Sequence, residues 1–247
     1  MDTDTPEWLH VLSQLKSSPK LTWMAEYNTS CIKKMKEIIG SNLAEFVDQI
    51  GLEDFIQDDC LNFKECNILL FEAIFWKLVE SNSEISKVKI EEMEVPDIEW
   101  WNRVSSLKIK SVSIVNSSIN LNTFNVFMKQ DLIENISLIQ SQMITELHCV
   151  CFNALRTLEV VKVTDMTRIT LVNCPSLESV SIKDCGSLSV YISNCKSIST
   201  FEIQNTNLNV LLLSDLQNIS NITIKGEELS KKNSNINFFS SLSIKLY

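Results

Sequence analysis

The feature that most constrains the fold is a repeat of aliphatic residues, at intervals of 10 or 11 residues between Leu147 and Ile222. Each copy reads Leu-x-x-Leu-x-Leu, where Leu stands for any aliphatic residue. The clearest copies begin at Leu155, Met166, Leu177, Ile198, Leu208 and Ile219. A sustained period of this kind is the signature of a solenoid, in which each repeat buries its apolar side chains only against its neighbours.

Shorter copies extend the repeat in both directions as two apolar residues separated by one position. They are Val88-x-Ile90, Ile98-x-Trp100, Leu107-x-Ile109, Phe124-x-Val126, Ile136-x-Leu138 and Leu147-x-Cys149, with Leu242-x-Ile244 near the end of the chain. The spacing slips around residues 116–122. Residues 226–238 are rich in Lys, Ser and Asn, and we expect them to form a loop before the last strand.

The period of about 11 residues is shorter than one coil of a solenoid needs. A coil of that length is too narrow to enclose two rows of Leu, Ile and Phe, whereas about 21 or 22 residues can enclose them with one strand on each side. We therefore predict that each sequence unit is half a coil, and that odd and even units form two opposed parallel sheets. Alternation along each strand places two side chains inward and one outward.

Two segments connect this repeat to a known family. The segments Asn173-Cys174-Pro175-Ser176-Leu177 and Asp184-Cys185-Gly186-Ser187-Leu188 resemble the strand-ending Asn/Cys position and the following turn of leucine-rich repeats. The resemblance covers roughly residues 85–247, and this chain departs from the family by its half-repeats of about 11 residues. Family repeats are usually about 20 to 29 residues long. The resemblance implies a solenoid that binds other macromolecules.

The first eighty or so residues have helical spacing instead. Thr5-Pro6-Glu7 is a helix-start signal, and further helices are expected at about Trp23–Ile39 and Phe63–Ser81. We predict an α+β chain with a helical N-terminal cap in residues 1–83. A leucine-rich-repeat-like parallel β-solenoid would follow in residues 84–247.

Residues for catalysis are scarce. The chain has only two histidines. Its four glycines are too few and too scattered for a phosphate-cradling loop. His148 is predicted to point outward and Cys149 inward, which opposes a nucleophile–base pair. We expect no catalytic residues, no cofactor and no enzyme activity. A hydrolase or transferase with an unrecognised site is the alternative from a different class.

The eight cysteines do not match zinc-ligand spacing, and we expect no metal site. Under the half-coil interpretation, Cys174 and Cys195 stack on one side of the solenoid and Cys185 lies on the other. We interpret them as small apolar residues in tight turns. The adjacent carboxylates of Asp58–Asp59 and Glu91–Glu92 are expected to be solvated.

The composition limits the compartments and the kinds of partner that we expect for this chain. The net charge of −9 disfavours broad contact with nucleic acid. The most apolar stretch, residues 68–79, is too short to span a membrane. We expect no secretion signal, reduced cysteines and a cytoplasmic or nuclear protein.

Two rows of outward residues follow from the predicted register. One is polar, with Glu159, Ser181, Glu202 and Thr223. The other holds His148, Thr170, Tyr191 and Leu212, and we take it as the candidate partner-binding site because it exposes a tyrosine and a leucine in register. The favoured function is a non-catalytic module or scaffold that binds a protein partner or a larger assembly. The alternative, from a helical region followed by leucine-rich repeats, is an F-box-type substrate receptor of a ubiquitin ligase.

Overall fold

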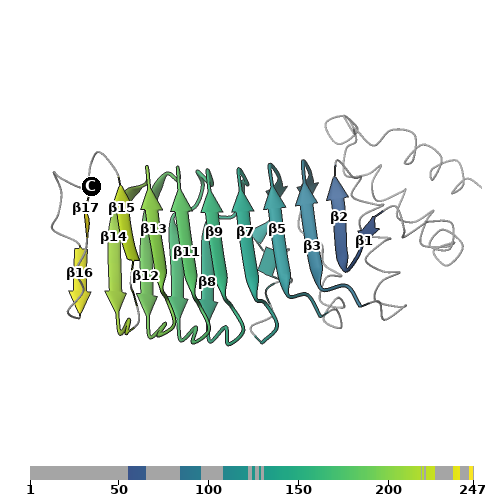
Figure 1. Cartoon of the computed structure of the whole chain (residues 1–247). Coiled ribbons are helices and arrows are strands. Elements are labelled where there is room, and N and C mark those ends of the chain that lie inside the picture. Colours follow the sequence, from purple (N-terminus) through teal and green to yellow (C-terminus); the bar gives the residue numbers. More distant parts are fainter. Residues whose placement is uncertain are drawn as a thin grey trace, which may run out of the picture.

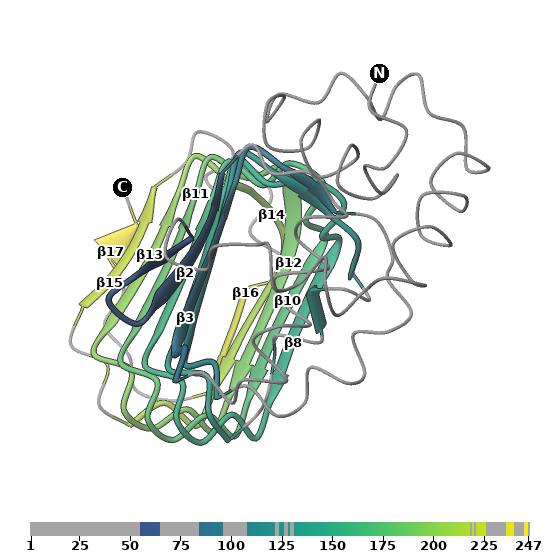
Figure 2. The same cartoon turned by 90° about the vertical axis from the view of Figure 1, so that its right-hand side faces the viewer.

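The computed structural model describes residues 55–64, 84–95, 108–121, 124–125, 128, 131–217, 219, 221–225, 236–239 and 245–246. These residues form a parallel β-solenoid, in which the strands alternate between two opposed sheets (Figures 1 and 2). The chain thus winds as a flattened coil, and the two sheets enclose the core between them.

The longer of the two sheets, here called the long sheet, has ten strands in the described part of the chain. In spatial order they are β1 (Ile56–Gln57), β2 (Cys60–Lys64), β3 (Lys87–Glu91), β5 (Ser111–Val115), β7 (Asn135–Ile139), β9 (Thr157–Val161), β11 (Ser179–Lys183), β13 (Thr200–Gln204), β15 (Asn221–Lys225) and β17 (Lys245–Leu246). All neighbours pair in parallel except β1, which forms an antiparallel hairpin with β2.

The short sheet faces it with five described strands. They are β8 (Glu146–Val150), β10 (Arg168–Val172), β12 (Ser187–Ser193), β14 (Asn207–Ser214) and β16 (Ile236–Phe239). A two-stranded sheet of β4 (Glu94–Val95) and β6 (Ser118–Ile119) lies in the preceding coils. The half-coil prediction is confirmed, because Val180 pairs with Leu158 and Phe201, one coil away on either side.

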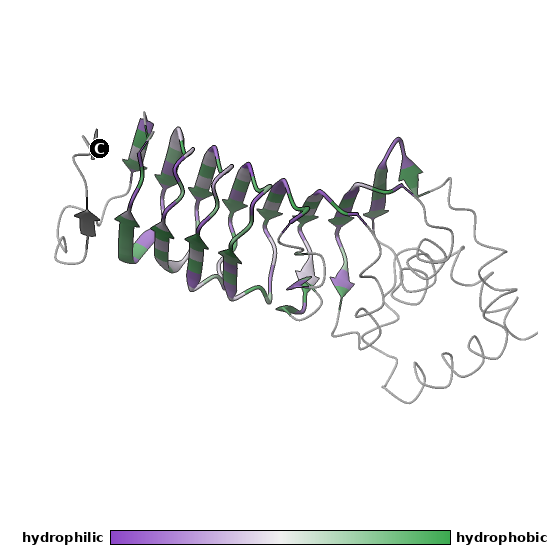
Figure 3. Cartoon of the chain, turned by 90° about the horizontal axis from the view of Figure 1, so that it is seen from below, coloured by the Kyte–Doolittle hydropathy of each residue, from purple (hydrophilic) through white to green (hydrophobic). Residues whose placement is uncertain are grey.

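Strict alternation of buried and partly exposed residues explains the core. In β11 the side chains of Val180 and Ile182 are fully buried, while the three residues beside them are partly exposed. The same pattern of two inward residues recurs in the five-residue strands of the long sheet from β2 to β15, and Figure 3 shows it as alternating hydrophobic and hydrophilic bands along the strands. Each inward row is continuous along the axis, so burial depends on stacking rather than on any one coil.

A left-handed backbone residue ends nearly every strand. Eleven residues directly after a strand have φ between 46° and 60°: Asp58, Glu92, Asn116, Gln140, Cys151, Lys162, Asn173, Asp184, Asn194, Asn205 and Asp215. Asn and Asp tolerate this conformation better than other non-glycine residues. Their amides also bond between coils, with the Nδ2 of Asn194 donating to the Oδ1 of Asn173 at 2.7 Å. The Asn/Asp position of the sequence repeat is therefore a corner residue.

The coil around residues 116–134 departs from the regular pattern. The predicted unit Phe124-x-Val126 is wrong as a strand, because residues 124 and 125 are helical. The Phe124 amide donates to the carbonyl of Asn120 at 2.9 Å, and its ring is fully buried. Phe124 thus contributes a buried ring to the core from a helical turn rather than from a strand.

Two other predictions need correction. The unit Leu107-x-Ile109 was expected to supply a strand, but the strand of that coil is β5, with Val112 and Ile114 inward. The expected loop at residues 226–238 is wrong at its end, since β16 begins at Ile236.

The predicted helical cap of residues 1–83 lies outside the described residues, except for residues 55–64. The helix expected from Phe63 is wrong at its start, because Phe63 and Lys64 belong to β2. Moreover, β2 pairs in parallel with β3, so the long sheet contains residues on both sides of the boundary predicted between residues 83 and 84.

The shortened spacing near Val190 has a local structural cause. Leu188 and Val190 are separated by one residue, where other copies have two. The next strand in the sheet, β14, keeps the longer spacing, so its register with β12 shifts between Leu188 and Ser189 and leaves Asn209 without a partner position. Ser187 hydroxyl donates to the Oδ1 of Asn209 at 2.8 Å and closes this bulge.

Gly186 precedes this shortened strand, and replacing it with alanine should destabilise the chain. A Cβ there would lie 2.8 Å from the backbone oxygen of Thr164, so the backbone must shift. We expect Gly186→Ala to lower the free energy of unfolding by about 1–3 kcal/mol, measured by urea denaturation. Lys196→Ala, at the exposed equivalent position one half-coil later, should change it by less than about 0.5 kcal/mol. Equal effects of the two variants would contradict the close contact.

Candidate functional site

The four residues predicted to form a ladder do so. On the short sheet Thr170 pairs with both His148 and Tyr191, and Tyr191 also pairs with Leu212. All four lie at the central outward position of consecutive strands and are exposed or partly exposed. Parallel strands are about 4.8 Å apart, so the ladder extends about 15 Å along the axis.

Two further rows flank this ladder, which sequence reasoning did not select. We call the outward side chains of β8, β10, β12 and β14 the short-sheet face. It consists of Glu146, His148, Val150, Arg168, Thr170, Val172, Ser189, Tyr191, Ser193, Val210, Leu212 and Ser214. The same period-2 alternation would have found the flanking rows, since they lie two residues on either side of the ladder.

The short-sheet face is largely uncharged. Val150 is 40% exposed, and Val172, Val210 and Leu212 are partly exposed. Its charged residues gather on β8 and β10. There the imidazole Nε2 of His148 lies 2.8 Å from a carboxylate oxygen of Glu146, and this hydrogen bond holds the pKa of Glu146 below its usual value. On β12 and β14 the outward residues are hydroxyl-bearing or apolar.

Arg168 and Tyr191 form the most defined contact on this face. The guanidinium carbon of Arg168 lies 5.8 Å from the centre of the Tyr191 ring, within the range of a cation–π interaction. No carboxylate of the described residues lies within ion-pair distance of Arg168. A guanidinium has five N–H donors, so Arg168 can still donate hydrogen bonds to a carboxylate of another molecule.

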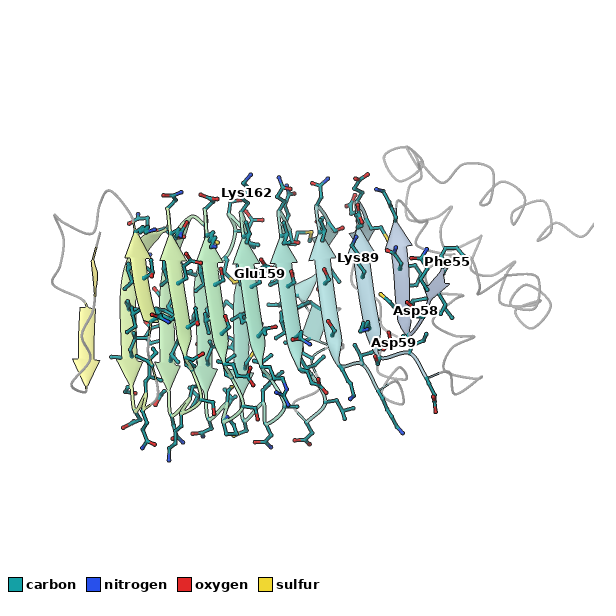
Figure 4. All side chains as sticks on the ribbon, viewed as in Figure 1. Phe55, Asp58, Asp59, Lys89, Glu159 and Lys162 are labelled. Carbon is teal, nitrogen blue, oxygen red and sulfur yellow. The ribbon has the colours of Figure 1, made fainter. Side chains whose placement is uncertain are left out.

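The long sheet presents a different outward face. Its predicted polar row is in register, because Ser181 pairs with Glu159 and Glu202, and Glu202 pairs with Thr223. The carboxylate of Glu202 bonds to Lys183 at 2.7 Å, which lowers the Glu202 pKa. Figure 4 shows Glu159 and Lys89 on this face among many polar side chains. Among the described residues, an outward tyrosine lies on the short-sheet face and none lies on the long sheet.

The paired carboxylates at the N-terminal end of the long sheet are not simply solvated, contrary to expectation. Asp59 bonds to Lys87 at 2.8 Å and to the hydroxyl of Ser86, and these contacts lower its pKa. The carboxylate of Glu91 bonds to Lys64 at 3.0 Å, from the preceding strand. The neighbouring residues Asp58 and Glu92 are exposed, and both have a left-handed backbone conformation in the turn after a strand. These carboxylates hold coils together and form no acid–base pair.

Three of the cysteines, Cys174, Cys185 and Cys195, occupy the buried position that follows a corner residue. The thiols of Cys174 and Cys195 lie 3.7 and 3.4 Å from the carbonyl oxygens two residues earlier, and Cys185 repeats this contact on the other side at 3.4 Å. Ser117 and Thr206 fill the same position elsewhere and donate the same hydrogen bond. The thiols thus act as small donors for corner carbonyls, which extends the predicted role in tight turns.

The described residues bring together neither a metal-ligand group nor a His148–Cys149 pair. No group of three or more His, Cys, Asp or Glu residues could hold a metal ion there. Cys149 is fully buried and His148 is exposed on the other side of the same strand, as predicted. Burial raises the pKa of the Cys149 thiol well above its usual range, which opposes a reactive thiolate.

Comparison with known proteins yields no assignment. No protein-family model, curated protein or solved structure matches this chain. No helix among the described residues has the length and apolar character needed to cross a bilayer.

The thiol positions predict a site-resolved pattern of alkylation. Cys151 is an exposed corner residue, whereas Cys149, Cys174 and Cys195 are fully buried. With iodoacetamide at pH 8, followed by peptide mass spectrometry, Cys151 should react at least tenfold faster than these three. In 6 M urea the four rates should converge. Labelling of Cys149 as fast as Cys151 in the folded chain would contradict its inward placement.

Proposed function

We propose that this chain is a non-catalytic protein-interaction module that binds a partner protein through the short-sheet face. The observation that carries the proposal is the ladder of Thr170, Tyr191 and Leu212 in register on consecutive strands. Aromatic residues with flanking apolar side chains are frequent anchors of protein interfaces. Solenoids also offer extended rigid surfaces that lose little conformational entropy when a partner binds.

The character of the face supports a protein partner over nucleic acid. The chain carries a net charge of −9, and the charged residues of the short-sheet face are a glutamate, an arginine and a histidine. A phosphate backbone would need a cluster of cations. The six described cysteines are free, and we place the protein in a reducing compartment such as the cytoplasm or nucleus.

The proposal predicts that partner binding depends on two side chains. The full-length chain is used as bait in native lysate, and a captured protein is identified and purified. The Tyr191→Ala/Leu212→Ala variant should then bind that partner at least tenfold more weakly by calorimetry, because the loss of an interface anchor costs about 1.5–4 kcal/mol.

The matched control is Ser181→Ala/Thr223→Ala, which alters the central outward row of the long sheet and should leave affinity unchanged. Circular dichroism must show that both variants fold. A partner that both variants retain would move the site to another surface. Consistent failure to capture a partner would favour a hydrolase or transferase with an unrecognised site.

A further inference from the structure

Resting on the proposed function, we infer that the partner presents a short extended segment to the short-sheet face, with a carboxylate for Arg168 and an apolar side chain for Tyr191 and Leu212. Three observations lead to this occupant: the size of the face, the state of the Arg168 side chain and the spacing of the two contact points.

The four strands of the short-sheet face fit an extended segment. At a spacing of about 4.8 Å, with five residues each at about 3.3 Å, they give a footprint on the order of 300 Å². A segment of about six extended residues, roughly 20 Å long, matches the width of the four strands.

The surroundings of the Arg168 side chain indicate that the partner supplies a carboxylate. Several neighbouring cations of the solenoid are paired, such as Arg156 with Glu178 at 3.0 Å and Lys183 with Glu202 at 2.7 Å. Arg168 instead lies over the Tyr191 ring. The nearest acid in register, Glu146, is hydrogen-bonded to His148 and interacts with Arg168 only through a longer-range electrostatic attraction. The cation–π contact restrains the guanidinium beside the ring, and a planar guanidinium can bind a carboxylate in bidentate fashion.

The net negative charge of the chain does not prevent this contact. Charges more than about 8–10 Å away are largely screened at physiological salt, whereas a direct guanidinium–carboxylate pair is screened only in part. Binding should therefore weaken as salt rises, but only as one exposed ion pair requires.

The spacing of the two contact points sets the motif. The guanidinium lies 5.8 Å from the Tyr191 ring on one side, and Leu212 lies in the adjacent strand on the other, about 4.8 Å from Tyr191. In an extended segment, residues i and i+2 point to the same face about 6.8 Å apart. An acidic residue two positions from a leucine or phenylalanine thus spans the distance from the guanidinium to the Tyr191 ring, and the apolar side chain lies at the side of the ring that faces Leu212.

The experiment uses fluorescein-labelled nine-residue peptides in a Gly/Ser background, each with one Asp and one Phe. The two residues are separated by one to five positions, and each peptide is titrated with the full-length chain by fluorescence polarisation. We expect the tightest binding at a separation of two. Arg168→Gln should weaken the binding of this peptide at least fivefold. Replacing the Asp of the peptide by Asn should cause the same loss with the unchanged chain, and no further loss with Arg168→Gln.

The matched control is Arg156→Gln, which removes an exposed arginine from the long-sheet side and should leave binding unchanged. A flat dependence on separation, or equal effects of Arg168→Gln and Arg156→Gln, would overturn the inference. The proposed function is tested separately. A protein partner whose binding is lost with Tyr191→Ala/Leu212→Ala but unchanged with Arg168→Gln would support the interaction module and contradict the acidic segment. Loss of the same peptide with both variants would support both.

Discussion

Parallel pairing between coils is the constraint on which the rest of this structure depends. A coil buries nothing by itself, and its two inward rows become a core only when the next coil stacks on it in register. Val180 and Ile182 are fully buried because Leu158 and Val160 lie below them and Phe201 and Ile203 above them. The corner residues make this pairing possible. Their left-handed backbone turns the chain at the edge of the sheet, and the small residue that follows points inward and donates a hydrogen bond.

The regular half of this architecture was predictable because one arithmetic period determines it. Once two units of about 11 residues make a coil, the positions of His148, Thr170, Tyr191 and Leu212 follow, and so do the inward Cys149 and the two sides of the cysteine stacks. The carboxylate contacts were not predictable in the same way. Asp59 meets Lys87 from 28 residues away, and such a pair is visible only when the register of irregular coils is known.

The failures of sequence reasoning have local causes. The strand at Cys60–Lys64 has only two inward residues, Leu61 and Phe63, and the apolar run that follows it obscures their alternation. The coil of β5 offers aliphatic residues at 107, 109, 112 and 114, which permit two choices of strand. Phe124 is buried from a helical turn rather than from a strand, and a pattern of apolar pairs does not distinguish these two conformations.

The bulge between β12 and β14 has a consequence for how such a chain can diverge. It lies at the entrance of the strands, before the inward residues Val190 and Leu211, and absorbs a difference of one residue between successive coils. An insertion or deletion at this point leaves the outward side chains downstream in place. The same event between Val190 and Ile192 would exchange the inward and outward residues that follow. Length variation among descendants of this gene should therefore accumulate at the strand entrances, while the outward face evolves by substitution alone.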